Sequence, residues 1–253
     1  MPPRFVIGDS KNLTADTVWK LGSATPSIKE ATQIVLDWDD TLLHSSCLAD
    51  AGYKLPCLSP LPQAISEDCA NLAKMVIRLI KRAKKYARVM IITAAEHWWV
   101  KACMEKFMPE LIPHMNSIDV VSARKYQKTY MSPIDWKRAI FRDELHKDYL
   151  RNILSIGDGI PEQEAMRSLG CPAGVLTKII KLLPEPKVEV LIAQLENIIY
   201  ALPDLLNSGQ NLDLKNGVVD VPMPPIPPQI ILGKSIAERR RNKKAARLAN
   251  KIE

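Results

Sequence analysis

The chain has 253 residues, 47% hydrophobic and 25% charged, with a net charge of +7; this composition is typical of one globular domain with extensions. No apolar run reaches the roughly 18 residues of a membrane span, and the start of the chain lacks a secretory pattern, so we expect no membrane partner. Five cysteines without a C-x-x-C pair argue against a disulfide framework or a zinc site and for a reducing compartment, cytoplasmic or nuclear.

Five short apolar runs follow an N-terminal extension, residues 1–32, that shows no sustained periodicity. Each run is bounded by polar residues or glycine, which is the pattern of a buried parallel strand when helices lie between the runs. The runs cover residues 33–38, 89–93, 118–122, 152–156 and 173–177.

Helical patterns separate these runs. Apolar residues recur at helical spacing from Cys69 to Ala83, with Ser66 as the expected N-cap. Residues 96–108, 134–147 and 162–169 also predict helices, and Pro133 and Pro161 stand where proline opens a first turn. Alternating strands and helices predict an α/β domain over residues 33–183, built on a doubly wound parallel sheet.

The C-terminal third changes character. Residues 184–220 predict a helical extension, with a long helix from Val188 to about Leu206 that is kinked at Pro203. Residues 221–253 predict a proline-rich linker followed by a basic tail. Residues 234–253 hold eight of the 35 Lys and Arg residues and two of the 28 acids, which leaves the rest of the chain at a net charge of +1. We expect the tail, Lys234 to Lys251, to bind RNA, an acidic protein surface or an import receptor, with a solvated helix as the alternative.

Three predicted strand ends carry residues suited to phosphoryl chemistry. Asp37 and Asp39 leave the first strand two residues apart, so their side chains project to the same side. Thr93 ends the second strand, Asp158 follows the fourth, and Glu162 lies four residues later. Carboxyl ends of parallel strands share one edge of the sheet. Mg²⁺ among these carboxylates would offset their repulsion and the charge of a phosphate.

A site of this kind also needs a protein cation to offset charge on the transferring phosphoryl group. Lys137 opens the predicted helix that precedes the Asp158 strand. Lys125 and Lys128 lie nearby in the sequence and are the alternatives.

The sequence from Asp37 to Thr41 resembles the first motif of the haloacid dehalogenase (HAD) superfamily, Asp-x-Asp-x-Thr after an apolar strand. Thr93, a lysine and the acid after Gly157 then follow in the family's order, and the resemblance covers about residues 33–180. It implies that Asp37 is a nucleophile that forms an aspartyl-phosphate. It implies that Asp39 is the general acid/base and also binds Mg²⁺ through its main-chain carbonyl.

The same resemblance implies roles for the later elements. Thr93 and the lysine would bind the phosphoryl group, Asp158 would complete the metal site, and Glu162 would stand behind it. The few residues between about 43 and 63 fit a short flap and no large cap. By analogy with open sites in the superfamily, this implies a macromolecular substrate, a phosphoprotein or a nucleic-acid end.

The expected function is therefore Mg²⁺-dependent hydrolysis of a phosphomonoester. The alternative is a non-catalytic HAD-fold subunit, anchored by its basic tail in a ribonucleoprotein or another large assembly. Outside the motifs, Trp98 and Trp99 are expected to pack in their helix, with the mouth of the site as the alternative for one of them. Arg124 is expected to contact the substrate or to lie on the surface. The four histidines show no metal-binding spacing and are expected to be surface or hydrogen-bonded residues.

Overall fold

The computed structural model describes residues 27–55 and 59–215. Most of the predicted N-terminal extension, and all of the predicted proline-rich linker and basic tail, lie outside these residues. The four cysteines within the described ranges are free thiols. No helix in these ranges combines the length and the apolar character needed to cross a membrane.

The core of the protein is a six-stranded sheet in which every pairing is parallel. The strand order is β3-β2-β1-β4-β5-β6. This confirms the predicted α/β class with a doubly wound parallel sheet. The strands are β1 (Thr32–Leu36), β2 (Arg88–Thr93), β3 (Asp119–Ser122), β4 (Asn152–Gly157), β5 (Leu176–Lys181) and β6 (Leu212–Lys215).

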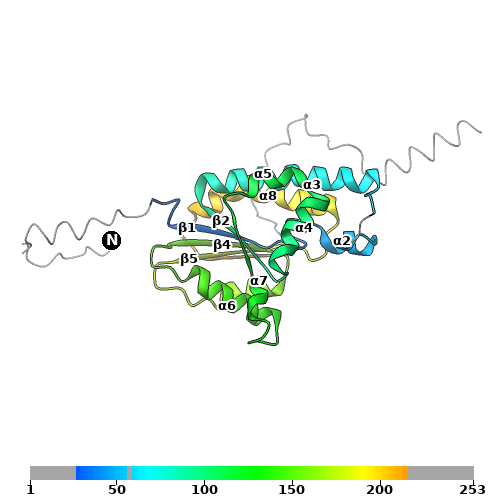
Figure 1. Cartoon of the computed structure of the whole chain (residues 1–253). Helices are drawn as coiled ribbons and strands as arrows, with labels where there is room; N and C mark the ends of the chain where they lie inside the picture. Colours follow the sequence, from blue (N-terminus) through cyan, green and yellow to red (C-terminus); the bar gives the residue numbers. More distant parts are fainter. Residues whose placement is uncertain (1–26, 56–58, 216–253) are drawn as a thin grey trace, which may run out of the picture.

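Helices cover both faces of the sheet (Figure 1). One layer contains α3 (Gln63–Tyr86), α4 (His97–Phe107) and α8 (Val188–Asn207), and the other contains α6 (Pro133–Leu145) and α7 (Ile160–Arg167). Short elements complete the chain: α2 (Ser45–Asp50), η1 (Pro109–Leu111), α5 (Ile112–Met115) and η2 (Ala123–Tyr126).

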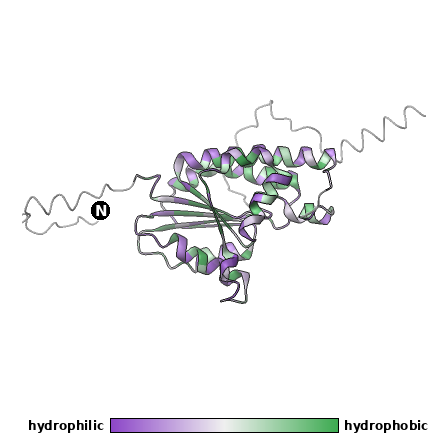
Figure 2. Ribbon diagram, viewed as in Figure 1, coloured by the Kyte–Doolittle hydropathy of each residue, from purple (hydrophilic) through white to green (hydrophobic). Residues whose placement is uncertain are grey.

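Alternation along each strand divides the core between these layers. In β1, Ile34 and Leu36 pack with α3 and α8, whereas Val35 packs with α6 and α7. Side chains two residues apart point to the same face of a strand, so a strand buried on both faces reads as a continuous apolar run. Figure 2 shows the corresponding pattern in α3 and α6, where hydrophilic and hydrophobic residues alternate along the ribbon.

The predicted start of the first long helix is wrong. Helix α3 begins at Gln63, and the Ser66 amide donates to the carbonyl of Pro62 at 3.0 Å, which places Ser66 inside the first turns. Pro62 has extended backbone angles, as expected of a residue that cannot donate a main-chain hydrogen bond and stands just before a helix. The polar run after Ser66 is therefore part of the helix and does not mark its start.

Two features near the C-terminus also differ from expectation. Strand β5 lies at Leu176–Lys181 and not at residues 173–177, because it includes the buried Lys178, which interrupts an apolar reading. Residues 184–220 contribute the edge strand β6 to the sheet as well as a helix. Helix α8 continues through Pro203 to Asn207.

The order of the strands decides where a site can form. Strand β1 pairs with β2 on one side and with β4 on the other. The chain leaves β1 toward β2 and β3, then crosses back from β3 to place β4 on the other side of β1. Ligands of open α/β sheets bind at such a switch point, outside the carboxyl ends of the strands. Asp37 follows β1 and Asp158 follows β4, which brings both carboxylates to this edge.

Candidate active site

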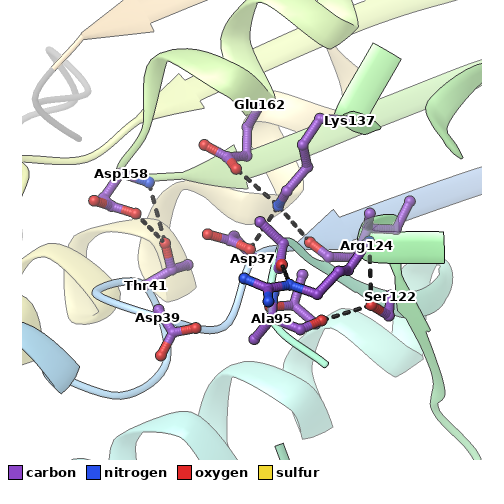
Figure 3. A network of polar contacts seen from close by, with 12 residues as sticks. Asp37, Asp39, Thr41, Ala95, Ser122, Arg124, Lys137, Asp158 and Glu162 are labelled. Carbon is purple, nitrogen blue, oxygen red and sulfur yellow. Dashed lines mark hydrogen bonds and ion pairs between the residues drawn. The ribbon is translucent and has the colours of Figure 1, made fainter. Parts of the chain in front are cut away.

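Asp37 lies directly beyond the end of β1. Its amide donates to the carbonyl of Ile156 at 3.0 Å, which extends the β1–β4 pairing by one residue and fixes its backbone. The residue is only 8% exposed. Figure 3 shows its carboxylate among side chains that come from β4, α6 and α7.

Lys137 reaches this carboxylate from the first turns of α6. Its ammonium Nζ lies 2.7 Å from Oδ1 of Asp37, 2.7 Å from Oε1 of Glu162 and 2.6 Å from the carbonyl oxygen of Ile92. Three donors and three acceptors therefore match, although the residue is completely buried. Ser132 caps the helix by accepting from the amide of Ile134 at 3.2 Å, which helps to fix its start.

The two alternative lysines lie elsewhere. Lys125 is exposed and pairs with Asp143 at 3.6 Å, and Lys128 is exposed on the following turn. Of the three lysines considered from the sequence, the structure places Lys137 against Asp37.

Burial and charge act in opposite directions on this group. Burial raises the pKa of Asp37 to about 8, although the neighbouring Lys137 charge lowers it in part. Burial alone would lower the pKa of Lys137, but the charges of Asp37 and Glu162 outweigh it and raise that pKa. Burial would raise the pKa of Glu162, yet the attraction of Lys137 prevails and lowers it. The lysine thus stays charged and holds Glu162 ionised.

Three carboxylates converge closely enough to hold a metal ion. Asp37, Asp158 and Glu162 each offer an oxygen within 4.8 Å of the others. Lys137 neutralises one of their three charges when all are ionised, so an excess of negative charge remains. Carboxylate oxygens are the donors that Mg²⁺ and Ca²⁺ prefer, so the donor set fits a hard divalent cation. Burial also raises the pKa of Asp158 to about 6, and a cation would favour its ionised form.

Glu162 lies nearer to the centre than the sequence suggests. It belongs to the carboxylate group and pairs with Lys137, whereas a place behind Asp158 was expected. Its side chain packs on the turn after β4, where a Cβ on Gly157 would come within 2.6 Å of the Glu162 Cγ. The glycine after the strand therefore makes room for this carboxylate.

Thr41 holds the carboxylate of Asp158 in place, a role that we did not predict. The hydroxyl of Thr41 donates to Oδ1 of Asp158 at 3.3 Å and accepts from the Asp158 amide at 3.1 Å. Thr41 is completely buried, so this exchange of hydrogen bonds ties the loop after β1 to the loop after β4. The only sequence signal for it is its place at the end of the Asp-x-Asp-x-Thr motif.

Thr93 shapes the loop that follows β2. Its hydroxyl oxygen accepts from the amide of Ala95 at 3.0 Å, and Ser122 donates to the Ala95 carbonyl at 2.6 Å. The Thr93 hydroxyl acts as an acceptor in this bond and retains its own proton for donation. Its predicted contact with a phosphoryl group stays a prediction.

Asp39 stands apart from the three carboxylates. Its Oδ1 accepts a hydrogen bond from the indole Nε1 of Trp99 at 3.0 Å, and burial raises its pKa. The side chain thus lies on the α4 side of the loop, separate from Lys137. Its predicted contact with a metal ion, through the main-chain carbonyl, stays a prediction.

The two tryptophans of α4 differ from each other. Trp99 packs against the core as expected and also holds Asp39, whereas Trp98 is 60% exposed. A cavity of about 630 Å³ opens beside them. Asp39 and Ala95 belong to its lining, so it adjoins the loops that carry the site. Arg124 also lines it and donates to the carbonyl of Ala94 at 3.3 Å.

Comparison with known proteins adds little. No family model matches the chain, and no curated protein matches it. Among solved structures, the chain is similar to the crystal structure of the Legionella pneumophila effector Ceg4 with an N-terminal yeast Hog1p sequence. The two share 10% identity over 72% of this chain and 99% of that one, with a TM-score of 0.38. A likeness this weak supports no statement about family or function, which must come from the site itself.

Proposed function

We propose that this protein is a Mg²⁺-dependent phosphomonoester hydrolase of the HAD type that forms an aspartyl-phosphate on Asp37. The observation that carries the proposal is the group formed by buried Asp37, Lys137 and Glu162 and half-buried Asp158 at the switch point of a parallel sheet. Buried charges are costly unless they are paired. Three acids and one lysine at such a position are therefore better explained by chemistry than by stability.

The two aspartates take successive roles in the proposed reaction. An oxygen of Asp37 attacks the phosphorus atom, and the bond from phosphorus to the leaving oxygen breaks. Asp39 gives its proton to that oxygen. Asp39 then removes a proton from water, the water oxygen attacks phosphorus, and the bond to Asp37 breaks to release inorganic phosphate.

Lys137 and Thr93 assist by binding. The ammonium of Lys137 lies 2.7 Å from the attacking carboxylate, close enough for its charge to offset that of a phosphoryl group bound there. The hydroxyl of Thr93 can donate to another phosphoryl oxygen. A Mg²⁺ ion held by Asp37 and Asp158 would neutralise further phosphoryl charge and favour the ionised form of Asp37.

The test is hydrolysis of phenyl phosphate, with Mg²⁺ and with a chelator. We expect turnover that needs the metal and that falls at least about a thousandfold in Asp37→Asn, because the nucleophile is lost. Asp143→Asn is the matched control, since Asp143 is an exposed acid that pairs with Lys125; this variant should keep full activity. A parallel thermal melt establishes that both variants are folded.

Metal binding gives a second measurement. Mg²⁺ should raise the melting temperature of the native protein, because a ligand that binds only the folded state stabilises it. Asp158→Asn should remove most of this shift. Absence of turnover and of any Mg²⁺ effect in folded protein would contradict the proposal and favour the non-catalytic subunit, whose basic tail, residues 234–251, lies outside the described residues.

A further inference from the structure

The cavity beside α4 is distinct from the buried carboxylates. Its lining includes Asp39 but none of Asp37, Lys137, Asp158 or Glu162. Asp39 is therefore the one predicted catalytic side chain that faces this space. With a volume of about 630 Å³, the cavity is large enough for a small organic group.

Aromatic side chains form much of its wall. Trp98 and Trp99 stand edge to face, with ring centroids 6.0 Å apart and an interplanar angle of 77°. Tyr53, Leu48 and Phe107 contribute further apolar surface. Trp98 is 60% exposed, so much of this side chain, at the edge of the cavity, is open to solvent.

The position of Asp39 relates this space to the reaction. When phosphorus lies at Asp37, the leaving oxygen must lie within reach of the acid that protonates it, which is Asp39. The group attached to that oxygen then extends to the Asp39 side, into the cavity. Its occupant is thus the leaving group of the substrate, and the walls select the chemistry of that group.

We propose that the cavity binds an aryl group, so that the substrate is the phosphate ester of a phenol; this inference rests on the proposed function. Aromatic rings pack favourably against one another in edge-to-face and offset geometry. A sugar-phosphate leaving group would instead bring negative charge and hydroxyls against an apolar wall. Two cations, Lys54 and Arg124, belong to the lining. Arg124 lies 3.9 Å from Glu96, and Lys54 is exposed to solvent. Among the macromolecular substrates considered above, these walls favour a phosphotyrosyl side chain over a nucleic-acid end.

Trp98→Ala tests the wall without touching the reacting residues. Because Trp98 is largely exposed, the variant should fold. We expect kcat/KM for phenyl phosphate to fall about tenfold, and kcat/KM for glycerol phosphate, which has no ring, to change less than twofold. Tyr200→Ala is the matched control, an exposed aromatic residue on α8 that does not line the cavity; it should alter neither. Equal effects of Trp98→Ala on both substrates would overturn the inference.

Binding separates this inference from the proposed function. Phenylphosphonate and methylphosphonate carry a phosphorus–carbon bond that the proposed reaction does not cleave, and calorimetry with Mg²⁺ measures the affinity of each. We expect the phenyl compound to bind at least about tenfold more tightly, and Trp98→Ala to remove most of that preference. Preferential binding without turnover of any phosphate would support the aryl site and reject the hydrolase. Equal affinities would overturn the aryl site, even in an active hydrolase.

A comparison of two substrates identifies the source of the aryl group. A phosphotyrosyl peptide turned over faster than phenyl phosphate supports a protein substrate, and the reverse order supports a small aryl ester. The same peptide with phosphoserine, and an oligonucleotide with a 5′ phosphate, should both react at least tenfold more slowly than the phosphotyrosyl peptide. Either of them reacting as fast would overturn the proposal.

Discussion

The two sides of the loop after β1 bury ionisable groups in opposite ways. On the lysine side, formed by Asp37, Lys137 and Glu162, every charge has an oppositely charged partner at 2.7 Å. On the flap side, formed by Asp39, His44 and Trp99, no ion pair within the described residues joins the buried groups. His44 is 5% exposed, and its Nδ1 has no hydrogen-bond partner among the described residues.

The difference teaches that burial alone does not decide the charge of a basic side chain. The carboxylates around Lys137 raise its pKa despite complete burial. Burial lowers the pKa of His44 to about 4, because Asp40 and Glu189 attract its proton too weakly to compensate. The lysine side therefore keeps its charges through ion pairs. On the flap side, burial raises the pKa of Asp39 and lowers the pKa of His44, so both shifts favour the uncharged forms.

Removing the central cation should break the lysine side most severely. Lys137→Met keeps much of the side-chain volume but leaves Asp37 and Glu162 buried without a partner. We expect the free energy of unfolding at pH 7, without Mg²⁺, to fall by about 3–5 kcal/mol. The deficit should shrink on acidification, because Glu162, which Lys137 holds ionised in the native protein, can then bind a proton. Urea denaturation followed by circular dichroism measures both effects.

Lys125→Met is the matched control for that experiment. Lys125 and Asp143 lie 3.6 Å apart, but their side chains are 48% and 47% exposed, so solvent screens the pair. Loss of this ion pair in Lys125→Met should change the free energy of unfolding by less than about 0.5 kcal/mol. If Lys137→Met were as mild as this control, Lys137 would not be the cation that compensates the buried acids.

The flap side predicts a pH dependence of its own. Burial lowers the pKa of His44 to about 4 in the folded protein, whereas an unperturbed histidine has a pKa of about 6.5, so the unfolded chain binds a proton first as the pH falls. The stabilising effect of a neutral His44 is complete above pH 6.5 and is lost progressively down to pH 4. By linkage, the loss amounts to about 3 kcal/mol. The free energy of unfolding, measured by urea denaturation between pH 4 and pH 7, should show it.

His44→Gln isolates this contribution, because glutamine does not titrate. The variant should lose less stability than the native protein between pH 7 and pH 4, whatever its stability at pH 7. His97→Gln replaces an exposed histidine and should leave the slope unchanged. Parallel curves for the native chain and His44→Gln would show that His44 is not held neutral.

Much of the fold could be predicted from the sequence, because buried parallel strands read as apolar runs. The prediction failed where charge or length broke that pattern. Strand β5 includes Lys178, which is buried and donates from its ammonium to Asn152 at 2.6 Å. A lysine is not expected in a core from its sequence position alone. Strand β6 has four residues that alternate between half-buried and exposed, too few to distinguish from a loop.

The candidate site divides in the same way. Asp37 and Asp158 could be predicted because each directly follows a strand, and parallel strand ends meet. Lys137 lies 100 positions from Asp37, so the sequence could only place it on a helix near the site and leave two alternatives open. Trp99 has no local signal at all. From the sequence, its ring is expected only to pack in the core. That its single N–H group donates to Asp39 is evident only from the position of α4 in the structure.

Loss of the Trp99 N–H donor should have the smallest effect of the three predicted for Lys137, His44 and Trp99. Trp99→Phe keeps a ring in α4 but removes the hydrogen bond of 3.0 Å to Asp39. An intramolecular hydrogen bond contributes about 0.5–1.5 kcal/mol after exchange with water is counted, so we expect kcat for phenyl phosphate to fall by up to about tenfold. KM should change little, because Trp99 acts through the orientation of Asp39. Trp98→Phe keeps the cavity wall and should leave kcat unchanged; an equal fall in both variants would mean that the ring matters and the N–H does not.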